Sequence, residues 1–120
     1  MTLEECYAAM DGDLEGVRGR LLTDDRIRKF TGIFLQDKSF ENLGASLDEG
    51  NLAEAFRAAH TMKGISRDLG FIPLYEVSSA LADALRPDDA GVPAAMDQVP
   101  DLYRATQEAY QRVVDALALL

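Results

Sequence analysis

The stretch that decides the fold is residues 51–70, NLAEAFRAAHTMKGISRDLG, which carries a helix start, a helix stop and amphipathic spacing. Asn51 is a favourable N-cap residue with Glu54 at the reciprocal capping position, and Gly70 stops the helix after Leu69. At about 100° per residue, four apolar residues gather on one side of this helix: Ala55, Ala58, Met62 and Leu69. The stretch therefore predicts a long helix that buries one side against other helices.

The only histidine of the chain, His60, falls on the opposite side of this helix. A core histidine would face the apolar side, so this one is placed to meet something outside the molecule. Lys63, Gly64 and Arg67 follow on the same side at +3, +4 and +7. A surface histidine often has no role, and basic neighbours are often only a solvated face. Gly64 favours a function, because a mid-helix glycine costs roughly 0.5–1 kcal/mol and lets another molecule approach closely.

Two further residues flank the histidine on the helical wheel, Phe56 and Arg57. Phe56 has two interpretations, packing against a neighbouring helix or contact with a partner. Between residues 57 and 67 the charges are Arg57, Lys63 and Arg67, with no acid among them. An imidazole with an ordinary pKa near 6.5 is largely neutral and nucleophilic at pH 7. Cations beside it would attract a phosphoryl group, so the pattern favours a phosphoryl carrier.

Helical spacing recurs through the rest of the chain, and the alternation typical of strands is absent. We predict a short helix ending near Gly12, weak helix over 13–22, a helix capped by Asp24 or Asp25, and one capped by Ser39. Further helices are predicted from Pro73 and around Pro100, which starts the last helix or kinks it, with a loop at 86–92. These elements predict an all-α protein, an antiparallel up-and-down four-helix bundle over residues 23–120 with a helical extension at 1–22.

Composition narrows the possible functions. The 120 residues suit one domain, and a net charge of −9 argues against a dominant nucleic-acid interface. No apolar run is long enough for a membrane span, and the N-terminus lacks the pattern of a signal peptide, so we predict a cytoplasmic protein. Cys6 is the only cysteine, which leaves no internal disulfide and no usual zinc ligand set. We expect the chain to have no cofactor and no metal of its own.

The motif around His60 resembles the histidine phosphotransfer (HPt) domain of bacterial two-component phosphorelays. The matching pairs are Ala59-His60, Lys63-Gly64 and Leu69-Gly70, with the family spacing intact. The resemblance implies a four-helix bundle whose His60 accepts a phosphoryl group at Nε2 from a receiver-domain aspartate and passes it to another receiver. It implies that Lys63 neutralises the phosphoryl charge, that Gly64 leaves room for the receiver, and that the magnesium ion belongs to the receiver. The chain departs from the family at residues 65–68, Ile-Ser-Arg-Asp, where small residues and an amide are common.

We therefore predict a stand-alone phosphoryl carrier without its own kinase domain, since the chain lacks a glycine-rich phosphate loop followed by Lys and Ser/Thr. The expected partners are response-regulator receiver domains and a hybrid histidine kinase, with no nucleic acid, no membrane and no second copy of the chain. The predicted docking surface combines the His60 helix and the helix from Pro73, with Phe56 and Phe71 as contacts and Arg57 and Arg67 beside them.

Two alternatives remain. The first is an HPt-like bundle that binds a receiver or a kinase without being phosphorylated. The second is an unrelated enzyme, which is disfavoured by the absence of a second histidine, a metal-ligand set and a nucleophile–base pair.

Overall fold

The computed structural model describes all residues, 1–120, as helices joined by short loops in a molecule of 46 × 23 × 21 Å. The elements in chain order are α1 (Leu3–Ala9), α2 (Leu14–Leu21), α3 (Asp24–Gln36), α4 (Ser39–Glu49), α5 (Leu52–Asp68), α6 (Ile72–Leu85), the 3₁₀ turn η1 (Met96–Gln98) and α7 (Val99–Leu117). The predicted all-α class is confirmed.

The helix containing His60, α5, begins and ends where the sequence predicts. Its N-cap Asn51 accepts a hydrogen bond from the Glu54 N–H at 3.2 Å. The preceding helix stops at Gly50 and α5 stops just before Gly70, with φ angles of 72° and 71° respectively. Both values lie in the left-handed region that favours glycine. Pro100 lies in the first turn of α7, so it starts this helix rather than kinking it.

Two predicted N-caps are wrong. Thr23, and not Asp24 or Asp25, caps α3, because its hydroxyl accepts a hydrogen bond from the Arg26 N–H at 3.2 Å. Ser39 is the first residue of α4 instead of its cap, and its N–H donates to the Asp37 carboxylate at 2.8 Å. In both places a side chain one or two residues earlier in the chain satisfies the free N–H groups at the helix start.

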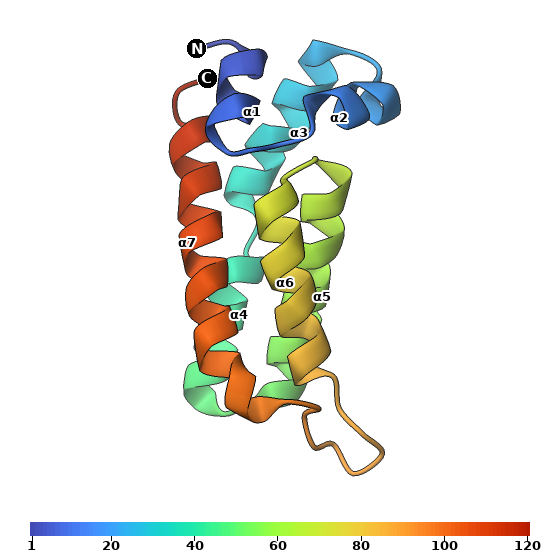
Figure 1. Ribbon diagram of the computed structural model, residues 1–120, viewed down its shortest axis with the longest axis vertical. Helices are drawn as coiled ribbons and strands as arrows, with labels where there is room; N and C mark the ends of the chain where they lie inside the picture. Colours follow the sequence, from blue (N-terminus) through green and yellow to red (C-terminus); the bar gives the residue numbers. More distant parts are fainter.

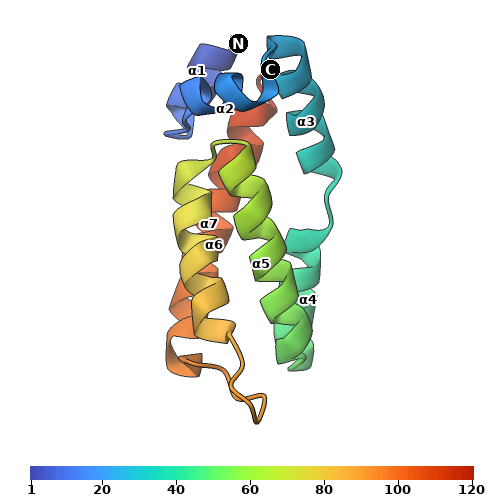
Figure 2. The ribbon, with the colours of Figure 1, turned by 90° about the vertical axis from the view of Figure 1, so that its right-hand side faces the viewer.

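The bundle has four sides, and one of them is formed by two helices. α3 and α4 follow each other along the long axis, while α7 runs nearly the whole length beside them (Figure 1). α5 and α6 form an antiparallel hairpin that packs against α4 and α7 (Figure 2). The predicted up-and-down bundle and its central hairpin are therefore confirmed.

Residues 1–22 share the core of the bundle. α1 packs on α7 near the C-terminus, and α2 packs on α3 (Figure 1). Five residues of this segment belong to the 23-residue buried hydrophobic cluster: Leu3, Cys6, Tyr7, Met10 and Val17. Burial of each such side chain contributes about 1.5–3 kcal/mol, so α1 and α2 stabilise the whole molecule.

The helices are too short or too polar for a lipid bilayer. None of them meets the length and hydropathy that a membrane span requires.

Candidate functional site

The side chain of His60 is exposed on the outer face of α5, as its wheel position predicts. The residues on the core-facing side of α5 are small or flexible and are buried: Ala55, Ala58, Ala59 and Met62. Their alignment on the inner face fixes the orientation of the helix, and that orientation leaves the imidazole in solvent.

One shallow hollow beside the imidazole contains the predicted C-terminal neighbours of His60. Lys63, Gly64 and Arg67 line it together with the histidine, along with residues Thr61, Ile65 and Asp68. The structure thus brings together the residues that were predicted from spacing at +3, +4 and +7. A negatively charged group carried by the imidazole would lie among these side chains.

The charges around His60 are not equally available. Arg67 forms an ion pair with Asp68 at 3.3 Å, and Arg57 forms one with Glu54. Lys63 takes part in no ion pair in the structure, so its ammonium group remains free to bind an anion. Of the three basic residues noted in the sequence, only Lys63 is without an ion pair, whereas Arg57 and Arg67 are each paired with an acid.

A second hollow on the other side of the imidazole contains Phe56, Arg57 and Arg86. The Phe56 ring lies 5.9 Å from the imidazole, between ring centroids, and is tilted by 57°. The Arg86 guanidinium lies over the same Phe56 ring, with its Cζ 5.3 Å from the ring centroid, a cation–π contact. Phe56 therefore packs against the end of the neighbouring helix α6 and also lies beside the imidazole, while its contact with a partner stays a prediction.

Sequence reasoning missed Arg86, which it assigned to a loop. Arg86 caps the C-terminal end of α6 and reaches the His60 surface only because α6 packs antiparallel to α5. Its guanidinium also pairs with Asp83 at 3.4 Å, which helps to hold it in place. Spacing along a single helix carries no signal for such a neighbour.

The prediction that Phe71 contacts a partner is wrong. Its side chain is 0% exposed, and its ring packs edge-on against Phe34 at 5.0 Å and near Tyr7 at 6.0 Å, both measured between ring centroids. Phe71 follows Gly70, whose left-handed backbone turns the chain into the core at the α5–α6 corner. An aromatic residue directly after a helix stop looks exposed in a sequence, but here it anchors that corner.

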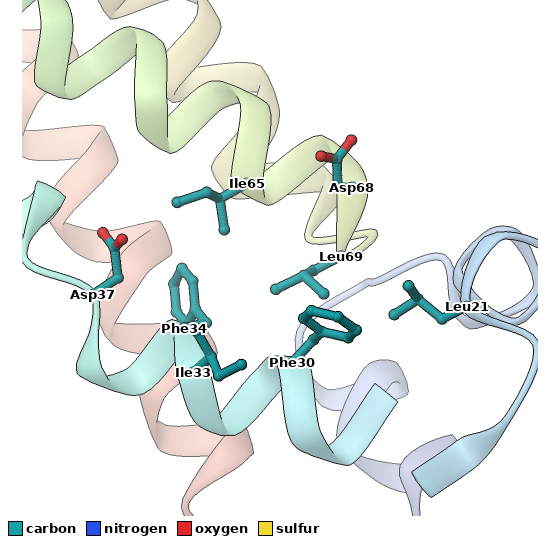
Figure 3. Close-up of a pocket in the computed structure, with 8 residues that line it drawn as sticks. All are labelled: Leu21, Phe30, Ile33, Phe34, Asp37, Ile65, Asp68 and Leu69. Atoms are coloured by element: carbon teal, nitrogen blue, oxygen red, sulfur yellow. The ribbon is translucent and has the colours of Figure 1, made fainter. Parts of the chain in front are cut away.

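The apolar surface near His60 lies between α3 and α5, on the side away from α6. It forms a groove of about 280 Å³ lined by Leu21, Phe30, Ile33, Phe34, Asp37, Ile65, Asp68 and Leu69 (Figure 3). Ile65 and Asp68 also line the hollow of His60, so the groove and the hollow are continuous. None of the large exposed apolar side chains belongs to α5 or α6, the two helices of the predicted docking surface.

The comparison with protein families adds one match. The family model described as Hpt domain matches residues 35–116, which is more than half of the chain. The chain belongs to the Hpt domain family. The matched range covers the end of α3 and the whole of α4, α5 and α6, and so includes the exposed His60. No curated protein and no solved structure matches the chain.

In this Hpt domain the two glycines of the motif have different physical roles. At Gly70 an added Cβ would lie 2.5 Å from Val17 Cγ2 and 2.7 Å from the Asp13 carbonyl oxygen. At Gly64 an added Cβ would meet no atom within 4 Å. The fold therefore needs glycine at position 70, whereas nothing in the chain itself requires it at position 64.

Because no residue of the chain packs against Gly64, substitutions at this position can test whether a partner uses the space beside it. Gly64→Ala should raise the free energy of unfolding by about 0.5–1 kcal/mol, because alanine is the better helix former. The same methyl group should slow phosphoryl transfer from a receiver, and Gly64→Gln should slow it further by filling more of the space. Urea unfolding and transfer rates would be measured on the same samples.

Gly32→Ala is the matched control, since Gly32 is also helical and also free of neighbours within 4 Å of an added Cβ. It should stabilise the protein to a similar degree and leave the transfer rate unchanged. Equal transfer rates for all three variants and the wild type would show that the space beside Gly64 is not used.

Histidine, cysteine and carboxylate side chains do not gather into a metal site. The structure has no group of three or more of them close enough to hold an ion. The single cysteine, Cys6, is buried in α1, and its thiol points to the Ala116 carbonyl oxygen at 3.4 Å.

Proposed function

We propose that this Hpt domain is a stand-alone phosphoryl carrier in which His60 accepts the group from a receiver-domain aspartate and returns it to another receiver. The observation that supports this most is the position of the only histidine, exposed between two hollows that contain cationic side chains. We propose that the protein acts in the cytoplasm as a monomer, and that a receiver or a hybrid histidine kinase is the phosphoryl donor.

In the proposed transfer, the imidazole of His60 is the nucleophile. Nε2 of a neutral His60, protonated on Nδ1, attacks the phosphorus atom of the partner's aspartyl phosphate. One P–O bond breaks and one P–N bond forms, and the aspartate leaves as a carboxylate. The reverse step transfers the group from Nε2 to the carboxylate of the second receiver. The magnesium ion that balances the phosphoryl charge is proposed to be held by the receiver.

Lys63 is proposed to bind the equatorial oxygens of the phosphoryl group during both steps. It lies one helical turn from His60, lines the same hollow and has no competing carboxylate. Phosphoryl transfer depends chiefly on positioning and on stabilisation of those oxygens, which a free ammonium group can supply. Arg67 and Arg57 are proposed to contribute less, because each is already paired with a neighbouring acid.

The groove between α3 and α5 is proposed as the main contact of the receiver. It is the apolar surface continuous with the His60 hollow, and its exposed side chains include Phe30 and Ile33, which are 36% and 51% exposed. Apolar contacts beside a charged centre provide affinity, while the charged centre carries the chemistry.

A charge placed in this groove should weaken docking without changing the nucleophile. We expect Ile33→Glu to weaken the affinity for a receiver by about tenfold, a change typical of a residue in the middle of an interface. Leu35→Glu is the matched control, because Leu35 is an exposed apolar residue of the same helix that does not line the groove. Isothermal titration calorimetry would compare the two, and equal affinities would remove the groove from the docking surface.

The second candidate function is docking on a receiver or kinase without phosphorylation. The groove alone would serve it, since neither Phe30 nor Ile33 takes part in chemistry. Phosphoryl transfer from phosphorylated receivers to the wild type and to a His60 variant separates the two functions, because only a carrier acquires the label.

A further inference from the structure

The C-terminal end of α5 is held by the segment that precedes the matched region. Four consecutive backbone carbonyls, those of residues 67–70, accept hydrogen bonds from residues 1–22. The Arg20 guanidinium donates to the carbonyl oxygens of Arg67 at 3.0 Å and Asp68 at 3.0 and 3.2 Å. The Tyr7 hydroxyl donates to the Leu69 oxygen at 2.8 Å. The Asp13 N–H donates to the oxygen of residue 70 at 2.8 Å.

This arrangement satisfies groups that a helix cannot satisfy by itself. The last carbonyls of an α-helix lack intrahelical partners, and they form the negative end of the helix dipole. A guanidinium presents several N–H donors in a rigid plane, so Arg20 can bridge two neighbouring carbonyls in one orientation. Its positive charge also offsets the dipole. Burial raises the pKa of the Tyr7 hydroxyl, which therefore remains a donor at neutral pH.

The turn held in this way is the one that connects the two parts of the partner surface. Asp68 lines both the His60 hollow and the apolar groove, and Arg67 lines the hollow. Arg20 binds the backbone of these same two residues. The next residue after Arg20, Leu21, forms part of the groove wall (Figure 3). The position of the last turn of α5 relative to α3 is therefore tied to α2.

We propose that residues 1–22 act as a clamp on the partner-facing turn of α5, and that Arg20 is its positioning residue. The inference rests on the proposed function, because it concerns how a receiver meets the His60 surface. Arg20 does not contact the imidazole, so the clamp acts on the docking of the partner and leaves the nucleophile unchanged.

The test measures phosphoryl transfer to Arg20→Gln from two donors, a receiver domain that must dock and a small molecule that need not. With a phosphorylated receiver domain, kcat/KM for transfer to His60 should fall by about tenfold, because small displacements in a docked complex are costly. With phosphoramidate, which needs no docking surface, labelling of His60 should stay within about twofold of the wild type, because the nucleophile itself is untouched. Arg26→Gln is the control, since Arg26 is an exposed arginine of α3 that makes no side-chain hydrogen bond or ion pair.

Amide hydrogen exchange provides a readout that does not depend on transfer. The N–H groups of residues 69–71 donate the hydrogen bonds that end α5, and the backbone oxygens of residues 65–67 accept them. They should exchange faster in Arg20→Gln than in Arg26→Gln, while the amides around His60 exchange as in the wild type.

Three results would overturn the clamp. The first is unchanged exchange at residues 69–71 in Arg20→Gln. The second is a wild-type kcat/KM with the receiver. The third is a parallel loss with both donors, because it would place the effect at the nucleophile or in global unfolding. Absence of transfer to the wild-type protein would instead contradict the proposed function, and the exchange data would still decide whether Arg20 holds the turn.

Discussion

His60→Ala is expected to abolish phosphoryl transfer to this protein from every receiver domain that labels the wild type. His60 is the only histidine, so no second imidazole can replace it. A phosphoramidate P–N bond is labile in acid and stable in base, and the label on the wild type should show this behaviour. Transfer would be measured with a panel of phosphorylated receiver domains from the same organism, by following radiolabelled phosphate.

The variant should remain folded, because the side chain is exposed and makes no hydrogen bond. We expect its free energy of unfolding to stay within about 0.5 kcal/mol of the wild type, as is usual for surface substitutions. Gln107→Ala replaces an exposed residue of α7 and is the control for effects of a surface substitution as such; it should be labelled like the wild type. A wild type that binds a receiver but takes no label would favour the docking function, and label retained by His60→Ala would place the acceptor elsewhere.

Phe71→Ala should produce the largest loss of stability among the residues discussed. The ring is fully buried against Phe34 and Tyr7, so its removal loses burial and leaves a cavity at the α5–α6 corner. Such changes cost about 3–5 kcal/mol, which is a large part of the stability of a small domain. Urea unfolding followed by circular dichroism would measure the loss.

Phe71→Leu keeps most of the volume and should cost about 1–1.5 kcal/mol, so it keeps the test informative where the alanine variant fails to fold. Phe30→Ala is the comparison for an aromatic residue at the surface, and it should cost about 1 kcal/mol because that ring is 36% exposed. The folded Phe71→Leu protein should bind a receiver normally. Weaker binding at nearly unchanged stability would return Phe71 to the docking surface.

Local signals explain why much of the fold could be predicted. The caps and stops at Asn51, Gly50 and Gly70 act over one helical turn, so neighbouring residues in the sequence contain the information. The same is true of the His60 surface, because Lys63 and Gly64 share one helix with the histidine. The errors at Ser39 and Asp24 have a related origin, since several polar residues in a row compete to cap a helix and only the backbone geometry decides among them.

Contacts between helices account for what sequence reasoning missed. Arg86 reaches Phe56 because α6 returns antiparallel to α5, and the groove next to the His60 hollow is lined by residues of both α3 and α5. Arg20 meets the end of α5 although 47 residues separate it from Arg67. The spacing of residues within a single helix carries no information about contacts between different helices.

The sequence by itself determined the all-α class, the ends of α5 and the exposed side on which His60 lies with Lys63 and Gly64. These features follow from a repeat of 3.6 residues per turn and from the separation of apolar and polar residues on one helix. Only the tertiary structure decided that Phe71 is buried, that the apolar groove lies toward α3, and that residues 1–22 hold the end of α5. Each of these depends on how separate helices pack, and packing is a property of the complete core.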